Sequence, residues 1–206
     1  MMKKLLHVGC GEHTKKDTIP YFFNEDWEEI RFDINPNINP DIIGSLTDMS
    51  AVKSESIDAL YSAHNIEHLF EHEVGIALSE FYRVLKIDGF LVLTCPELKS
   101  LCKFVANNGL HAVAYPFPGG SITPHDIIYG WGPALKKGEL FMAHKCGFDA
   151  DSMRDKLAIA GFCDVSIFVS EPNYALWAIA RKSLDCQDNG TQFARLVLDG
   201  LPFFNF

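Results

Sequence analysis

The 206-residue sequence lacks several features that would place it in other classes of protein. No two cysteines have the CxxC spacing, so the six cysteines indicate neither a zinc ribbon nor a disulfide framework. No run of Lys or Arg occurs and the formal net charge is −9, which argues against a nucleic-acid partner. The apolar run after Lys3 and Lys4 covers only residues 5–8, too short for a signal peptide or a membrane span. We therefore expect a cytoplasmic protein with reduced thiols and no membrane partner.

Short apolar segments alternate with helical patterns along the chain, without internal repeats. The sequence predicts strands over residues 4–8, 29–32, 41–43, 57–62, 90–95, 164–169 and 174–180, and helices over 74–86, 97–107 and 151–160. Only four residues join the last two strands, so these form an antiparallel hairpin. The alternation predicts one α/β domain over residues 1–206. Its sheet would be doubly wound, Rossmann-like and mostly parallel, with an antiparallel C-terminal hairpin strand.

Two segments fall outside this alternation. Residues 108–148 are rich in Pro, Gly, aromatic residues and His, which predicts an irregular insertion serving as a substrate-side lid. A structural loop with its aromatic side chains tucked inward is an equal alternative. The C-terminal tail, residues 183–206, begins polar and ends apolar, so it packs either on its own core or on a second copy in a homodimer.

Two glycines follow the first predicted strand, as Gly9-Cys10-Gly11. Glycine lets the backbone approach a ligand closely, and ligands bind at the carboxyl ends of strands in such sheets. An ordinary tight turn is the alternative. Thr14 stands where a dinucleotide-binding GxGxxG motif needs its third glycine, so the turn argues against a nicotinamide-dependent oxidoreductase.

Two carboxylates follow later strands. Asp33 stands about twenty residues beyond the glycines, where a carboxylate accepts hydrogen bonds from both ribose hydroxyls of a nucleoside. Its alternative role is to open the turn at Asn35-Pro36. Asp48 follows the third strand and could accept from an adenine amino group, or could equally cap a turn.

Histidines cluster after the fourth predicted strand. His64, His68 and His72 have i, i+4 and i+8 spacing, with Glu67 close by, and on one helix they would share a face as metal ligands. We expect His64 at the strand end, with Asn65 capping the next helical turn, so the three histidines do not share one helix. A packing or hydrogen-bonding role for His68 is the preferred interpretation, and no metal site is predicted.

These segments together resemble the class I S-adenosylmethionine-dependent methyltransferases, in particular their small-molecule, type 11-like group. The matching segments are Leu6–Gly11, Arg31–Asp33, Ile57–Tyr61, His64–Leu69 and Val84–Leu93. The resemblance implies S-adenosylmethionine as cofactor, with the methionine part over the turn and the ribose on Asp33. The cofactor-binding residues that it implies are His7, Gly9, Cys10, Gly11, Asp33, Ile34, Leu46, Thr47, Asp48, His64 and Asn65.

The chain departs from the family pattern at two places. His13 stands where a third glycine is common, and residues 12–28 leave room for only a short helix between the first two strands. A shortened wall of this kind would leave the cofactor more exposed.

The family's reaction places few demands on catalytic side chains, because the cofactor carries the reactivity. His64, His125 and His144 are the candidate bases, and Glu97 is a further pocket candidate. The function predicted is methyl transfer to a small-molecule substrate or a glycan precursor. The alternative is a catalytically inactive cofactor-binding or regulatory protein on the same fold.

Overall fold

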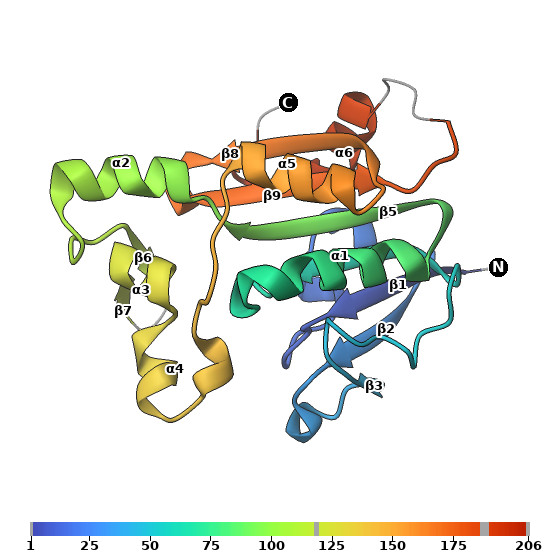
Figure 1. Ribbon diagram of the computed structural model, residues 1–206, viewed down its shortest axis with the longest axis horizontal. Helices are drawn as coiled ribbons and strands as arrows, with labels where there is room; N and C mark the ends of the chain where they lie inside the picture. The colour runs from blue at the N-terminus through green and yellow to red at the C-terminus, as the bar shows by residue number, and fades with distance from the viewer. Residues whose placement is uncertain (1, 118–119, 186–189, 205–206) are drawn as a thin grey trace.

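The computed structural model describes residues 2–117, 120–185 and 190–204, and a seven-stranded sheet forms its centre (Figure 1). The strand order is β3-β2-β1-β4-β5-β9-β8, in which β1 to β5 run parallel and β9 is antiparallel to both neighbours. The strands are β1 (Lys3–Val8), β2 (Trp27–Asp33), β3 (Ile42–Ile43), β4 (Ile57–Ala63), β5 (Leu85–Pro96), β8 (Cys163–Ser170) and β9 (Ala175–Arg181). The predicted fold class is confirmed, including the antiparallel hairpin.

One segment of β5 differs from the prediction. The sequence pattern of residues 86–89 is typical of a turn before the strand, but these residues bulge from within it, since the pairs Ile57 with Leu85 and Ala59 with Phe90 lie on either side. Asp88 adopts a φ of 64°, and the backbone amide of Asp88 donates to the Lys182 carbonyl. That bond explains how a turn-like sequence is held inside the sheet.

One face of the sheet is covered by α1 (Glu71–Val84) and α5 (Ala150–Ile159), which contact each other. The apolar residues of α1 recur at helical spacing and are buried, namely Val74, Ala77, Leu78, Phe81 and Val84. The Glu73 carboxylate accepts from the Phe70 amide at 2.8 Å and thereby caps the first turn. Another helix, α2 (Leu98–Asn108), follows β5 directly.

The other face is covered differently. Between β1 and β2 the chain forms only two 3-10 turns, η1 (Lys15–Asp17) and η2 (Pro20–Phe22), as the short spacing predicted. The C-terminal α6 (Gly190–Leu198) packs beside η2 and against β8 and β9. Its Ala194, Val197 and Leu198 are fully buried in the same cluster as Phe22 and Trp27. The described part of the tail therefore covers its own chain's core; residues 186–189 and 205–206 of the tail lie outside the described residues.

This packing makes the tail a determinant of stability. We expect Leu198→Ala to lower the free energy of unfolding by about 2–4 kcal/mol, because it removes a fully buried side chain. The matched control is Leu196→Ala, whose parent side chain is 61% exposed and whose effect should be within about 0.5 kcal/mol. Urea unfolding of both variants measures the difference; equal destabilisation would show that α6 does not pack as described.

The insertion is more ordered than the irregular loop expected from its prolines and glycines. It contains the hairpin β6 (Tyr115–Phe117) and β7 (Gly120–Ile122), α3 (Pro124–Tyr129), α4 (Gly132–Lys136) and η5 (Leu140–Met142); residues 118–119 lie outside the described residues. The order has a local cause, since Thr123 and Asp126 cap α3 reciprocally and Pro124 occupies its first turn. Figure 1 shows this insertion beyond the end of the sheet toward which the arrow of β5 points.

None of the helices in the described ranges is both long and apolar enough to cross a bilayer.

Candidate functional site

The glycine turn after β1 is held by Asp33 at the end of β2. Gly9 and Gly11 have φ values of 59° and 54°, a region that favours glycine. Asp33 Oδ2 accepts from the Gly11 amide at 2.9 Å, and Oδ1 accepts from the Asn35 amide at 2.8 Å. Asp33 as a whole is 8% exposed and therefore buried. Each oxygen keeps further acceptor capacity, so Asp33 can hold the turn and still accept from a bound hydroxyl.

Arg31 braces the same turn from β2, a role that sequence reasoning missed. Its guanidinium donates to the carbonyls of Gly11 at 2.6 Å, His13 at 3.1 Å and Asn39 at 3.3 Å. No α-helix follows the turn, so no helical amides are available to these carbonyls. The Arg31 guanidinium provides their hydrogen-bond donors instead. The sequence feature that could have indicated this role is the position of Arg31, two residues before Asp33 on the same strand.

Asn65 joins the end of β4 to the glycine turn. Its side-chain amide donates to the carbonyls of Val8 at 3.0 Å and Ala63 at 2.9 Å. A Cβ atom added at Gly9 would lie 1.8 Å from Asn65 Oδ1, so the side chain packs directly on the glycine backbone. Asn65 was expected to cap the next helical turn. It occupies the N-cap position before Ile66–His68, but its side chain makes no capping bond there, because the ends of β1 and β4 meet in the parallel sheet and offer it their carbonyls instead.

Three other residues predicted to contact the cofactor, Ile34, His7 and Cys10, lie in the sequence next to Asp33 or at the glycine turn, and they differ in exposure. Ile34 is 60% exposed beside Asp33, an apolar surface open to a ring. His7 and Cys10 are buried, and His7 Nδ1 lies 2.8 Å from Glu29 Oε1. Burial also lowers the pKa of His7, against the raising effect of Glu29. Their roles toward a cofactor stay predictions.

Asp48 faces solvent and its own turn. Its Oδ1 accepts from the Ser50 amide at 3.1 Å. Thr47 and Asp48 line a shallow cavity of about 520 Å³, and its other lining residues are Ser50, Ile76, Ser79, Glu80 and Arg83. Since this lining includes neither Asp33 nor the glycine turn, a contact from Asp48 or from half-buried Leu46 to adenine also stays a prediction.

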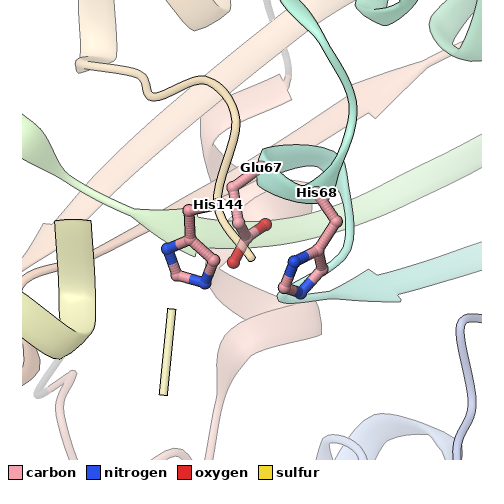
Figure 2. A group of neighbouring side chains, drawn as sticks. All are labelled: Glu67, His68 and His144. Atoms are coloured by element: carbon pink, nitrogen blue, oxygen red, sulfur yellow. The ribbon is translucent and has the colours of Figure 1, made fainter. Parts of the chain in front are cut away.

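A second group of side chains gathers on the 3-10 turn η4 (Ile66–His68), directly after β4. Glu67 is 1% exposed, and its Oε1 lies 3.2 Å from Nδ1 of His64. Figure 2 shows Glu67, His68 and His144 facing one another, and one ligand atom from each lies within 4.8 Å of the others. His144 arrives from the end of the insertion, because the amides of Lys145 and Cys146 donate to the Glu67 carbonyl at 2.8 and 3.3 Å.

The second oxygen of Glu67 is unusual. Oε2 is buried and has no hydrogen-bond partner among the residues that the structure describes. A buried acceptor left unpaired costs about 1–3 kcal/mol, so its retention calls for an explanation.

The electrostatics of this group favour an ionised Glu67. Burial alone would raise the pKa of Glu67, but the hydrogen bond and charge of His64, with the charges of His68 and His144, lower it. Burial lowers the pKa of His144, although Glu67 works in the opposite direction. For His64, partial desolvation opposes the carboxylate, yet the hydrogen bond to Glu67 raises its pKa above the usual value.

We expect an NMR titration of the His64 ring to give a pKa above the ordinary value of about 6.5, and Glu67→Gln to lower it. The pair should stabilise the fold fully below about pH 6.5 while Glu67 stays ionised, and it should lose that effect as pH rises through the folded pKa of His64. His72→Ala is the control, since His72 stacks on Phe70 at the start of α1 instead. An unchanged His64 pKa in Glu67→Gln would contradict the pairing.

The structure therefore brings two of the three candidate bases, His64 and His144, to one carboxylate. His125 is exposed on α3, where its ring stacks on His111 at 5.3 Å and lies tilted against Tyr129 at 5.0 Å. Glu97 is buried and caps α2, accepting from the amides of Lys99 and Ser100. His64, His68 and His72 lie on β4's end, η4 and α1, so they share no helix face, as expected.

Comparison with known proteins supports the resemblance seen in the sequence. Residues 6–93 match the family described as a methyltransferase domain, whereas no curated protein matches significantly. An S-adenosylmethionine-dependent methyltransferase from Archaeoglobus fulgidus is similar in fold, at 16% identity and a TM-score of 0.56, over 88% of this chain and 86% of that one.

Two ligand-bound structures share the fold as well. One is Burkholderia thailandensis 1,6-didemethyltoxoflavin-N1-methyltransferase with bound 1,6-didemethyltoxoflavin and S-adenosylhomocysteine, at 12% identity and a TM-score of 0.53, over 88% of this chain and 72% of that one. The other is Haemonchus contortus phosphoethanolamine N-methyltransferase 2 with S-adenosylmethionine, at 10% identity and a TM-score of 0.56, over 89% of this chain and 49% of that one.

Proposed function

We propose that this chain, which carries the methyltransferase-domain match over residues 6–93 and the fold of the S-adenosylmethionine-dependent methyltransferases, transfers a methyl group to a small molecule. The observation that carries the proposal is the glycine turn held by Asp33 at adjacent strand ends. A turn with positive φ values lets a ligand approach the backbone, and a buried carboxylate beside it accepts from ribose hydroxyls.

The described residues fit this cofactor. Asp33 would accept from the ribose, and Ile34, 60% exposed, offers an apolar surface to the adenine ring. Asn65 fixes the turn under the methionine part through its bonds to Val8 and Ala63. When bound, S-adenosylmethionine supplies an electrophilic methyl group.

The protein's part in the reaction is to align the acceptor and to take up its proton. His64 lies next to Asn65, and its Nδ1 is held by Glu67, which leaves Nε2 as the basic atom. Its side chain is 57% exposed, so an acceptor can reach it. This arrangement of an oriented imidazole is what general-base catalysis needs.

A small acceptor or a glycan precursor suits the surroundings best. The insertion supplies aromatic and charged side chains beyond the strand ends, among them Tyr129, Trp131 and Lys145. The net charge of −9 does not favour a nucleic acid. Support also comes from the Burkholderia enzyme of the same fold, which holds 1,6-didemethyltoxoflavin, a small molecule.

The alternative is a cofactor-binding protein without catalysis. The short crossover between β1 and β2, where only η1 and η2 occur, favours it because it leaves the cofactor side of the turn less enclosed.

The two functions are separated by turnover. Purified protein would be incubated with S-adenosylmethionine and a panel of small hydroxyl, amine and thiol acceptors, with S-adenosylhomocysteine formation as the readout. We expect turnover that His64→Gln reduces by about 100-fold or more and that His72→Gln leaves unchanged. Cofactor binding without turnover on any acceptor would favour the regulatory alternative.

A further inference from the structure

We propose that Glu67, His68 and His144 bind one divalent transition-metal ion of the zinc class. The ligand atoms would be Glu67 Oε2 and Nε2 of each histidine. The inference concerns metal binding alone and does not rest on the proposed methyl transfer.

The first observation is the orientation of the two rings. Nδ1 of His68 donates to the Ala143 carbonyl at 3.2 Å, and Nδ1 of His144 donates to the Ile127 carbonyl at 2.8 Å. A carbonyl can only accept, so Nδ1 carries the proton in each ring and Nε2 keeps the lone pair. Metal-binding histidines are held in this way, with the second ring nitrogen bonded to a carbonyl or carboxylate.

The second observation is the buried oxygen of Glu67. Oε1 is engaged by His64, while Oε2 has no partner among the described residues although Glu67 is 1% exposed. One potential ligand atom from each of Glu67, His68 and His144 lies within 4.8 Å of the other two, and no donor from the described residues reaches Glu67 Oε2. Adding one proton would pair only two of the three ligand atoms with each other, whereas one metal cation can bind all three.

The ligand set indicates which ion. Two imidazoles and one carboxylate suit zinc or iron(II), and three protein ligands leave an open position for water or a substrate oxygen. Ligand atoms around tetrahedral zinc lie about 3.3 Å apart, so small side-chain movements close the site. Magnesium prefers oxygen ligands and does not suit it.

The surrounding structure holds the site together. The Lys145 and Cys146 amides bond to the Glu67 carbonyl, so the returning insertion and η4 are joined beside the three side chains. His64 lies on the other oxygen of Glu67, so the metal and the proposed base share one carboxylate without competing for an atom.

The test is a zinc titration of the full chain after removal of metal with a chelator, against a competing chromogenic chelator. We expect one ion per chain. His144→Ala should weaken binding by about 100-fold or more, since even outer partners of metal ligands contribute about 10- to 100-fold. His72→Ala should leave it unchanged, and magnesium should not compete.

Glu67→Gln guards against loss of folding. Its amide can donate to a histidine lone pair, so at a pH above the folded pKa of His64 the metal-free variant should melt no lower than the metal-free parent, yet zinc should no longer raise its melting temperature. Absence of a one-to-one site in the parent, or a site that survives His144→Ala and Glu67→Gln, would overturn the inference. Zinc binding without S-adenosylhomocysteine binding would refute the proposed function alone.

Discussion

Replacing Asp33 with alanine is expected to weaken S-adenosylhomocysteine binding by about 100-fold or more. A hydrogen bond to a charged group contributes about 1.5–3 kcal/mol, and two ribose hydroxyls would lose their acceptor. The same substitution frees the Gly11 amide, which Asp33 Oδ2 holds at 2.9 Å, so the turn also loses its fixed shape. Calorimetric titration of parent and variant measures the effect.

The matched control is Glu28→Ala on the same strand. Glu28 is exposed near the start of β2, so this change removes an equal charge without touching the turn. Binding to Glu28→Ala should equal binding to the parent. If both variants bind equally well, Asp33 serves the turn alone and the cofactor site lies elsewhere.

Replacing Gly9 with alanine is expected to abolish cofactor binding and to lower the free energy of unfolding by about 3 kcal/mol or more. A φ of 59° costs a residue with a Cβ about 1–2 kcal/mol. The added Cβ would also lie 1.8 Å from Asn65 Oδ1, which forces Asn65 off its two carbonyl partners. Urea unfolding and calorimetry report the two effects separately.

Two other glycines calibrate this result. Gly11 has a φ of 54° but only His13 at 4.0 Å from an added Cβ, so Gly11→Ala should show the strain alone, about 1–2 kcal/mol. Gly75 lies in α1 with nothing within 4 Å, so Gly75→Ala should stabilise the protein by about 0.5–1 kcal/mol. Equal destabilisation by Gly9→Ala and Gly11→Ala would mean that the clash with Asn65 adds nothing to the loss in free energy of unfolding.

Most of the fold could be predicted from local patterns in the sequence. The alternation of apolar segments predicted the sheet, its hairpin and the helical pattern of α1, because strand and helix periods are local properties. The sequence left open whether the C-terminal tail packs on its own core or on a second copy of the chain. The apolar end of the tail indicates that it must pack, but the sequence does not indicate against which surface. The structure shows that α6 contacts η2 of the same chain.

The sequence indicated which candidate residues lie together only where strand ends determine it. Asp33, Asn65 and the glycine turn meet because neighbouring parallel strands end at one edge of the sheet. The group of Glu67, His68 and His144 was missed, since the path of the insertion brings His144 back to η4 and no spacing encodes that return. The brace from Arg31 was missed for a related reason: its partners are backbone carbonyls.

The cofactor site is tested most directly by a calorimetric titration of the folded parent protein with S-adenosylhomocysteine, with NAD as a parallel ligand. We expect saturable binding of one S-adenosylhomocysteine per chain and no binding of NAD, because the turn lacks the third glycine of a dinucleotide site. No binding of S-adenosylhomocysteine to a sample whose circular dichroism shows a folded α/β protein would contradict the proposed cofactor site.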